Sequence, residues 1–243
     1  VIHNLPVVSD ILRHFPDAVI DWVVEESFAA IPRLHPRVEE VIPVALRRWR
    51  KNLFSSATWA EIGTFRHQLR AQNYDMVLDT QGLLKSALIT AQAHGVKCGY
   101  DADSAREPIA ARFYERRYAV SKYTHAVTRN RQLAAAALGY VADSPPDFGI
   151  PAPTTNAAWL PRKPYAVLLT ATSRDDKLWP EKLWLELGQQ LSDKGLVSIF
   201  PGGSSTERER AVRLASTLPE AIAAPPMALP ELASLLAGAQ AVV

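Results

Sequence analysis

The 243-residue sequence contains one cysteine, Cys98, and shows no cysteine and histidine spacing of the kind that holds a structural metal. A single thiol excludes an internal disulfide framework and fits a reducing compartment. No apolar run approaches the roughly 18 to 20 residues that cross a bilayer, and no charged segment leads into an apolar one at the start. These absences predict a cytoplasmic protein, at most peripheral to a membrane.

Net charge is also small, because 27 lysines and arginines are set against 25 acidic residues, for a formal charge of +2. Such a molecule is no polyelectrolyte, and since it carries no recognised nucleic-acid motif, we expect no nucleic-acid partner. Any anion must then be recognised by a local cluster of cations. The hydrophobic content of 48% is ample for packed cores, in one large domain or two modest ones.

Strand-like and helix-like patterns alternate along the first half of the chain, which is typical of βαβ units and a parallel sheet. Strands are expected at 19–24, 38–44 and 76–78, and helices at 2–12, 59–69, 83–93, 105–118 and 125–138. Prolines then crowd a stretch without clear periodicity between residues 143 and 164. This stretch is the best candidate for a linker.

A second α/β pattern begins at Tyr165, with strands expected at 165–169, 196–200 and 239–243 and helices at 205–218 and 229–236. We therefore predict an α/β fold of two doubly wound, Rossmann-like domains, 1–150 and 165–243, joined by a linker at 151–164. Helical spacing from the first residues, and a last strand that is entered but not left, predict an internal fragment. Each domain would then be truncated at an outer end.

The segment from Thr170 to Trp184, TATSRDDKLWPEKLW, places small hydroxyls and closely spaced charges between a strand and a helix. The carboxyl end of a parallel strand is where open α/β sheets bind ligands, and a helix N-terminus there favours anions. Thr172, Ser173 and Lys177 are therefore candidate phosphate or sugar contacts. Ordinary helix capping beside a solvated charged turn explains the same residues.

Two further residues of the second half could face a nucleotide. Glu207 follows a Pro-Gly-Gly turn, near the start of a predicted helix, where a carboxylate can accept hydrogen bonds from ribose hydroxyls. The simpler interpretation is a capping carboxylate in an acidic first turn. Met227 lies in a loop before the last predicted helix, where it can cover an adenine face or only pack.

Cations cluster twice in the first half. The stretch Arg47-Arg48-Trp49-Arg50-Lys51 has no acid near it between residues 43 and 60, and several of its side chains should project from a loop as an anion patch. The second cluster runs from 106 to 131 with aromatic residues interleaved, a pattern that also fits an anionic lipid surface. A solvated helix face is the alternative for both clusters.

Several segments, taken in order, resemble glycosyltransferase family 9, and within it the lipopolysaccharide heptosyltransferases I. They are HNLPVVSDI, DWVVEESFAAIP, RRWRK, DTQGLLKSAL, SAREPIAARFY, ATSRDDKLWPEKLW and the Met227 loop with LLAGAQAVV. The likeness extends over nearly the whole chain. It implies the two-domain GT-B architecture and an inverting transfer of L-glycero-D-manno-heptose from ADP-heptose to the first Kdo sugar of Kdo2-lipid A, with no bound metal and no cofactor.

The resemblance also implies roles for individual residues. The donor contacts are Thr172, Ser173, Lys177, Glu207 and Met227, with Lys177 neutralising the leaving diphosphate. The acceptor contacts are Arg47, Arg48, Arg50, Lys51 and Arg106, which would meet Kdo carboxylates and lipid A phosphates. Ser173 stands where the family often has threonine, which preserves the hydroxyl. A peripheral position on the anionic inner face of the bacterial inner membrane is implied as well.

In the family, an aspartate expected to act as general base comes before the position of Val1, and a donor-binding motif with a histidine follows the position of Val243. Both lie outside this sequence, so we expect the chain alone to be inactive or nearly so. Loss of a positioned base costs on the order of a hundred- to ten-thousand-fold in rate. Two alternatives remain open: an ADP-heptose transferase that acts on a heptose acceptor, and a non-catalytic module that binds nucleotide or lipid.

Overall fold

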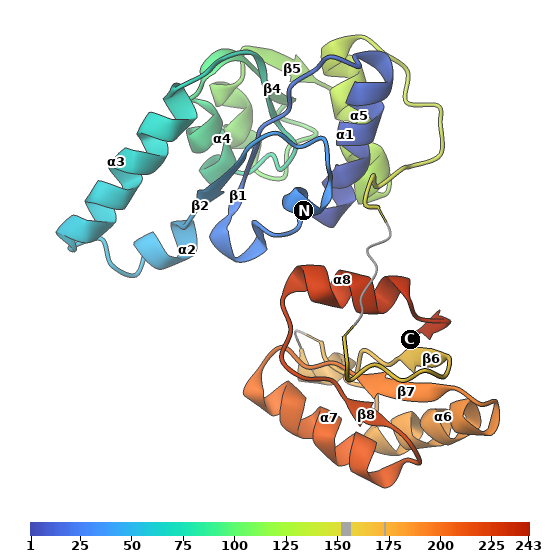
Figure 1. Ribbon diagram of the computed structural model, residues 1–243. Helices are drawn as coiled ribbons and strands as arrows, with labels where there is room; N and C mark the ends of the chain where they lie inside the picture. Colours follow the sequence, from blue (N-terminus) through green and yellow to red (C-terminus); the bar gives the residue numbers. More distant parts are fainter. Residues whose placement is uncertain (152–156, 173) are drawn as a thin grey trace. The chain divides into compact units, whose positions relative to one another are not determined.

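The computed structural model describes residues 1–151, 157–172 and 174–243. The chain divides into two compact units, Val1–Pro151 and Ala152–Val243. Each unit is α/β, and the strands described in each pair in parallel (Figure 1). Parallel neighbours must be joined by crossovers, which is why helices separate the strands along the chain.

The first unit contains a two-stranded sheet of β1 and β2 and a three-stranded sheet in the order β3, β4, β5. The strands are β1 Trp22–Glu25, β2 Val41–Val44, β3 Asn73–Asp79, β4 His94–Tyr100 and β5 Arg116–Tyr118. The α-helices are α1 Leu5–His14, α2 Leu46–Trp49, α3 Ser56–Arg70, α4 Leu84–Thr90 and α5 Ala126–Leu138. Short 3₁₀ turns are η1 Ile2–Asn4, η2 Glu26–Phe28, η3 Pro32–Leu34 and η4 Pro108–Phe113.

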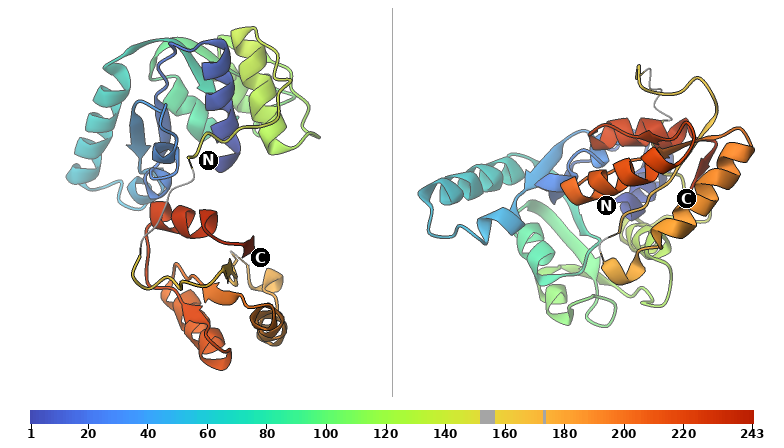
Figure 2. Two further views of the ribbon diagram at one scale, coloured as in Figure 1. Left: turned by 45° about the vertical axis from the view of Figure 1, so that its right-hand side comes forward. Right: turned by 90° about the horizontal axis from the view of Figure 1, so that it is seen from below.

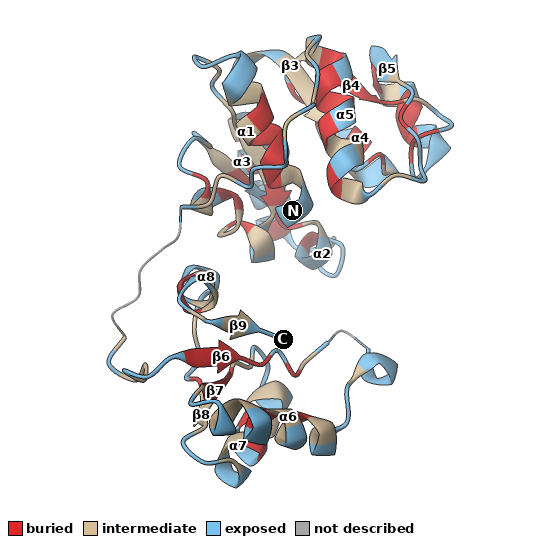
Figure 3. Cartoon of the chain, turned by 90° about the vertical axis from the view of Figure 1, so that its right-hand side faces the viewer, coloured by how far each residue is buried: buried red, intermediate tan, exposed pale blue. Residues whose placement is uncertain are grey.

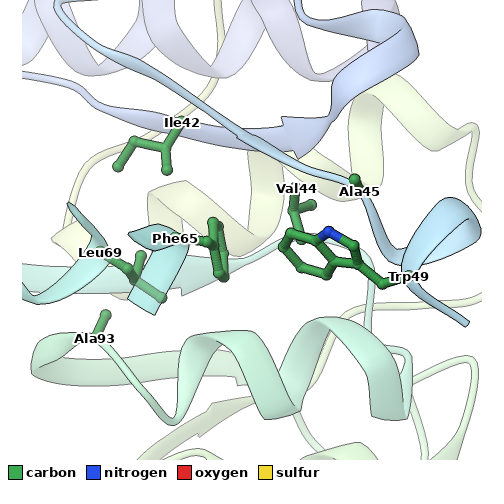
Figure 4. Packing of buried hydrophobic residues seen from close by; sticks show 7 residues of the cluster. All are labelled: Ile42, Val44, Ala45, Trp49, Phe65, Leu69 and Ala93. Carbon is green, nitrogen blue, oxygen red and sulfur yellow. The ribbon is translucent and has the colours of Figure 1, made fainter. Parts of the chain in front are cut away.

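One apolar core of the first unit lies around β2 and α3 (Figure 4). Its buried members are Ile42, Val44, Ala45, Trp49, Phe65, Leu69 and Ala93. Ile42 and Val44 alternate along β2 and so face the same side, while Phe65 and Leu69 are four residues apart on α3. The rings of Trp49 and Phe65 meet edge to face, with centroids 5.7 Å apart. This packing holds α2, and the cations on it, against the body of the unit.

Helices α1 and α5 lie side by side (Figures 1 and 2), and a buried ion pair joins them. Arg131 donates from Nε to Asp10 Oδ2 at 2.6 Å and from Nη2 to Asp10 Oδ1 at 3.0 Å. The Asp10 side chain is only 1% exposed and that of Arg131 9%. Loss of either partner would leave a buried, uncompensated charge, so the pair ties the two helices to one register.

The structure corrects the sequence-based prediction between residues 93 and 118. The predicted helix at 105–118 is wrong, because η4 and the strand β5 occupy this stretch, and Pro108 cannot continue an α-helix from the preceding residues. Strand β4 was not predicted, since two glycines weaken its strand pattern. Gly99 is needed there because a Cβ would lie 2.4 Å from the ring of Tyr114. Gly95, which follows the helix predicted at 83–93, also lies in β4, where a Cβ would lie 2.3 Å from the carbonyl oxygen of Tyr74.

The second unit contains one parallel sheet with strand order β8, β7, β6, β9. Its strands are β6 Tyr165–Val167, β7 Val197–Phe200, β8 Ile222–Ala223 and β9 Ala241–Val242. Its helices are α6 Glu181–Asp193, α7 Ser205–Thr217 and α8 Leu229–Ala237, with a 3₁₀ turn η5 at Asp175–Lys177. Helices α6 and α7 cover one face of the sheet and α8 the other (Figure 1).

Alternation along the central strands explains this two-sided packing. Val167 and Ile199 pack on the α8 side together with Leu235, whereas Leu168 and Phe200 pack on the side of α6 and α7. Successive side chains of a strand point to opposite faces, so a strand apolar at every position must be covered on both sides. Strand β6 is accordingly buried at each of its residues (Figure 3).

In the part of the chain that the structure describes, no helix is long and apolar enough to cross a membrane.

Candidate functional site

The carboxyl ends of β6, β7 and β8 open into a pocket of about 280 Å³. Leu169 lines it after β6, Gly202 and Gly203 after β7, and Met227 after β8, with Glu207 contributed by the first turn of α7. Parallel strands bring their carboxyl ends to one edge of the sheet, which is why residues far apart in the sequence converge there. The volume is near the lower end of the range for small-molecule sites, about 300–1,000 Å³.

Glu207 caps α7 and also lines the pocket, so it fits both interpretations that the sequence left open. Its Oε2 accepts hydrogen bonds from the backbone N–H groups of Gly203 at 2.7 Å and Ser204 at 3.1 Å, while Ser204 Oγ accepts from Glu207 N at 3.2 Å. This is a capping box, so the capping interpretation is confirmed. The same residue lines the pocket, and a carboxylate with about four lone-pair sites keeps room for further donors.

Gly202 sets how closely the loop after β7 approaches α7. A Cβ at this position would lie 2.7 Å from the backbone nitrogen of Arg208 and 2.8 Å from the carbonyl carbon of Glu207. These are backbone atoms of the helix start, so they cannot swing aside. The sequence indicated a flexible turn here, but the requirement for glycine comes from packing of the loop onto the helix.

Met227 packs and lines the pocket at once. It lies against the cluster that contains Val167, Ile199 and Leu235, and the same side chain forms part of the pocket wall. Its thioether therefore offers an adaptable apolar surface, held by the core behind it.

The segment after β6 contains the solvated charged turn that was one of the two interpretations of its sequence. Thr170 is buried and Thr172 is exposed, while Ser173 lies outside the described residues. The following charges form η5, and Arg174, the residue before it, pairs with Asp176 (Nε to Oδ1, 2.9 Å). Lys177 ends η5 and is exposed.

The helix expected after this segment is α6. It begins at Glu181, with Pro180 as its N-cap, directly after the turn that the charged residues form. The rings of Trp179 and Trp184 meet edge to face, with centroids 4.8 Å apart, and this contact anchors the start of the helix. The pocket wall described above includes neither Thr172 nor Lys177, so the structure brings Glu207 and Met227 together but does not bring Lys177 to them.

Four cations follow β2, and Arg48 among them is already paired. Its guanidinium lies 3.0 Å from Glu26 Oε2 and 2.8 Å from Glu61 Oε2, and these two carboxylates raise the pKa of Arg48 above its ordinary value. Neither acid lies within the sequence window that suggested an unopposed patch. The predicted loop is also partly helical, because Arg47 and Arg48 lie on α2.

The other cations of this segment face solvent. Arg50 and Lys51 are exposed. The Arg47 guanidinium lies 5.6 Å from the centroid of the Phe28 ring, and the Arg47 backbone N–H donates to Glu25 Oε1 at 3.3 Å. Residues that follow β1 and β2 thus meet beside α2, where Arg47, Arg50 and Lys51 keep their charges available for an anion.

Arg106 stands beside the turn at 79–82, which belongs to the segment DTQGLLKSAL but was given no role from the sequence. A Cβ on Gly82, where φ is +64°, would lie 3.3 Å from the backbone nitrogen of Arg106. The next residue, Glu107, holds this turn from two sides, donating its N–H to Gly82 O at 3.0 Å and accepting from Leu84 N at 2.6 Å. The turn is the one that follows β3, and its closeness sets the position of exposed Arg106.

The carboxylate of Asp79, at the end of β3, organises the same turn. It accepts hydrogen bonds from the backbone N–H of Gln81 at 2.8 Å and from the hydroxyl of Tyr114 at 2.7 Å. Burial, together with the negative charge of Asp79, raises the pKa of the Tyr114 phenol. A signal was present in the sequence, since polar residues directly follow an apolar strand there.

Comparison with known proteins places the chain among glycosyltransferases. The family model described as "Glycosyltransferase family 9 (heptosyltransferase)" matches residues 62–243. "Lipopolysaccharide heptosyltransferase 1" of Escherichia coli (strain K12) is 47% identical over 245 residues, which cover 100% of this chain and 77% of that protein. The protein of the same name from Pseudomonas aeruginosa is 46% identical over 245 residues and is covered over 69% of its length.

Solved structures of heptosyltransferases also match the chain. "E. coli heptosyltransferase WaaC with ADP" matches with a TM-score of 0.93 and 46% identity, over 99% of this chain and 76% of that one. The complex "with ADP-2-deoxy-2-fluoro heptose" gives the same TM-score over 77% of its chain. E. coli ADP-heptose heptosyltransferase II matches with a TM-score of 0.64 at 20% identity, a likeness of fold alone. The α/β, GT-B class and the resemblance noted in the sequence are confirmed, and the chain belongs to glycosyltransferase family 9, the heptosyltransferase family.

Proposed function

We propose that this protein transfers L-glycero-D-manno-heptose from ADP-heptose to the first Kdo of Kdo2-lipid A. The observation that carries the proposal is the pocket at the carboxyl ends of β6, β7 and β8, in a chain with a TM-score of 0.93 to a heptosyltransferase solved with ADP. We further infer that Ala152–Val243 binds the donor and Val1–Pro151 the acceptor.

Three features of the pocket suit the nucleotide of the donor. Met227 offers an apolar face to the adenine, and Glu207 offers acceptor capacity to the ribose hydroxyls. The backbone at Gly202 and Gly203 carries no side chain, so a ligand can approach it closely. The pocket is small for a whole nucleotide sugar and suits the nucleoside part, which leaves the diphosphate to extend beyond it.

The diphosphate needs donors and positive charge as it departs. A general base takes the proton of the acceptor hydroxyl as its oxygen attacks the anomeric carbon from the face opposite the leaving group. The bond from that carbon to the diphosphate oxygen breaks, and ADP leaves with added negative charge. We assign Thr172, Ser173 and Lys177 to this part of the donor. Lys177 would stabilise the departing oxygen, a type of interaction whose removal costs about 10²–10³ in rate.

The acceptor is an anionic glycolipid, and the cations around α2 suit it. We assign Arg47, Arg50 and Lys51 to its carboxylates and phosphates, together with Arg106 beside the turn after β3. Arg48 would join them only by exchanging Glu26 or Glu61 for an anion of the acceptor, so we expect its main effect to be on the placement of α2. Because the acceptor is a lipid, we place the protein at the inner face of the bacterial inner membrane.

A donor and acceptor panel tests the proposal, with release of ADP as the signal. The assay uses the 243-residue chain and, in parallel, a chain extended at both ends to the length of its relatives. Transfer from ADP-heptose to Kdo-terminated acceptors supports the proposal, and a response only to heptose-terminated acceptors would replace Kdo with heptose as the acceptor. If ADP-heptose supports transfer to no acceptor in the extended chain, the proposal is refuted.

Single substitutions then test the residues assigned to the donor and to the acceptor. Lys177→Ala and Arg47→Ala should each lower transfer, the first through the rate and the second through the KM for the acceptor. Lys182→Ala is the matched control for a lost surface cation, because its side chain is 86% exposed on α6. A loss of equal size in the control would show that general charge, and not the assigned contacts, governs the rate.

A further inference from the structure

The connection between α2 and α3 presents large apolar side chains to solvent. Phe54 is fully exposed, at 106% of its reference area, Trp59 is 60% exposed and Leu53 47%. The intervening residues 55–57 are exposed as well and uncharged. We call residues 50–59 the α2–α3 tip. Apolar side chains gathered in this way, next to polar residues, mark interaction sites more often than single exposed ones do.

The tip is held in shape by hydrogen bonds to its own backbone. The indole Nε1 of Trp59 donates to the carbonyl of Leu53 at 2.8 Å, and the Ser55 N–H donates to Asn52 O at 3.1 Å. At its base, buried Trp49 donates from Nε1 to Glu61 Oε2 at 2.8 Å. The apolar groups are therefore presented by a formed structure at the outer end of α3 (Figure 1), and little conformational entropy remains to be lost on binding.

The charge around the tip is predominantly positive. Arg50 and Lys51 are exposed at its start, with Arg47 one turn earlier. No acidic residue occurs between positions 41 and 60. Of the three acids that reach this region, Glu26 and Glu61 are engaged by Arg48 and Glu25 accepts from the Arg47 backbone N–H. The surface beside the apolar residues is thus cationic, which complements an anionic partner.

The size of the apolar group favours a bilayer over a protein as that partner. Leu53, Phe54 and Trp59 could bury at most about 150–250 Å² each, less than the ~800 Å² per partner of a stable protein interface. Aromatic and leucine side chains flanked by cations are the composition of segments that lie in the headgroup region of anionic membranes. The bilayer also supplies the remaining contact area without shape matching.

We propose that the α2–α3 tip inserts Leu53, Phe54 and Trp59 into the interface of an anionic lipid bilayer, with Arg50 and Lys51 against the headgroups. The inference rests on the proposed function, since an enzyme with a lipid acceptor has to work at such an interface. The inference adds to that function which part of the molecule contacts the membrane. The tip then holds the cations after β2 at the depth where the carboxylates and phosphates of a glycolipid acceptor lie.

Vesicle binding of the full 243-residue chain tests the tip without any acceptor present. Vesicles of phosphatidylglycerol mixed with phosphatidylcholine are compared with vesicles of phosphatidylcholine alone, by sedimentation. The double variant Leu53→Ser with Phe54→Ser should bind the anionic vesicles about tenfold more weakly, because the burial of two apolar side chains is lost. Arg50→Gln and Lys51→Gln should each weaken binding roughly fivefold, and only on anionic vesicles.

Tyr123→Ser is the matched control, because Tyr123 is 100% exposed and also lies in a cation-rich stretch, beside Lys122. It should change binding less than twofold. Brominated lipids should quench tryptophan fluorescence in the wild type, and this quenching should be lost in Trp59→Phe. Thermal unfolding of each variant shows that the fold is kept.

Several results would overturn the inference. They are unchanged vesicle binding by the double serine variant, an equal loss in Tyr123→Ser, or a loss of self-association in place of a loss of vesicle binding. ADP release separates this inference from the proposed function. In the chain extended at both ends, the double variant Leu53→Ser with Phe54→Ser should turn over a deacylated, water-soluble acceptor like the wild type, and it should be slower with a vesicle-embedded acceptor. Vesicle binding through the tip, without any transfer by the extended chain, would refute the proposed function but not the membrane-binding role of the tip.

Discussion

Replacing Gly202 with alanine should damage the nucleotide pocket by moving one loop. The new Cβ would meet the backbone nitrogen of Arg208 at 2.7 Å and the carbonyl carbon of Glu207 at 2.8 Å. Because backbone atoms at the start of α7 cannot yield, the loop after β7 has to shift away from the helix. The N–H groups of Gly203 and Ser204, which bind the Glu207 carboxylate at 2.7 and 3.1 Å, move with it.

The contacts of Gly202 set the expected loss of stability and of ADP affinity in this variant. Overpacking of this kind costs about 1–3 kcal/mol, and a weakened helix cap contributes about 1 kcal/mol more. We therefore expect the second unit to lose about 2–4 kcal/mol of unfolding free energy. The displaced loop forms part of the pocket wall together with Glu207, so the Kd for ADP should rise at least about tenfold, which is ~1.4 kcal/mol.

Isothermal titration with ADP and urea denaturation measure the two effects. The adjacent Gly203→Ala is the control, since a Cβ there meets only the flexible carboxylate Oε2 of Glu207, at 3.2 Å, and the donating N–H is kept. Its effect on ADP affinity should be less than about threefold, or ~0.6 kcal/mol. If Gly202→Ala binds ADP as the wild type does, or if both alanines are equally damaging, close packing of the loop on α7 does not shape a nucleotide site.

Three further predictions follow from groups elsewhere in the chain. Asp10→Asn should lower the unfolding free energy by about 3–5 kcal/mol in urea denaturation, because Arg131 stays charged and buried without its partner. Burial raises the pKa of the Tyr100 phenol from 10.0 to about 12. The unfolded chain therefore loses that proton first as the pH rises, and the contribution to stability, complete below about pH 10, should be lost by about pH 12. Denaturation of wild type and Tyr100→Phe at both ends of this window measures it. In the chain extended at both ends, Lys177→Ala should slow ADP release about a hundredfold, with an unchanged denaturation midpoint.

Each of these has its own control. Lys163→Gln removes an exposed pair with Glu220, whose side chains are 60% and 63% exposed, and should cost less than about 1 kcal/mol. The loss of unfolding free energy in Asp10→Asn has to exceed the loss in Lys163→Gln if the buried pair stabilises the fold more than an exposed one. The decline between about pH 10 and 12 should be smaller in Tyr100→Phe than in the wild type, and an identical decline would contradict the assignment. A denaturation midpoint that falls with activity in Lys177→Ala would indicate a structural role.

Local sequence predicted most helices and strands well where the apolar pattern was strong. The helix expected at 125–138 is α5, Ala126–Leu138, with His125 as N-cap and Gly139 as a left-handed C-cap. Prediction failed where glycine and proline serve tertiary contacts. Strand β4 contains Gly99 because the Tyr114 ring lies against it, and a contact between residues fifteen positions apart leaves no periodic trace.

The site shows the same division. Glu207 and Met227 were predicted, and the structure brings both to one pocket. The predicted unopposed charge of Arg48 is wrong, because Glu26 and Glu61 approach it from other elements. Whether a charge is free depends on distance in space, which the order of residues does not reveal. The organising role of Asp79 was missed for the same reason, since its partner Tyr114 is distant in sequence.

The sequence by itself determined the α/β alternation, the family resemblance and the types of side chain offered to each ligand. These depend on periodicity and on residue identity, which are local properties of the chain. Tertiary structure alone decided which carboxylates neutralise Arg48, why Gly202 has to be glycine, and that the apolar α2–α3 tip stays outside the core. Each of these depends on what packs against a residue, because charge pairing, close contact and burial are set by neighbours in space.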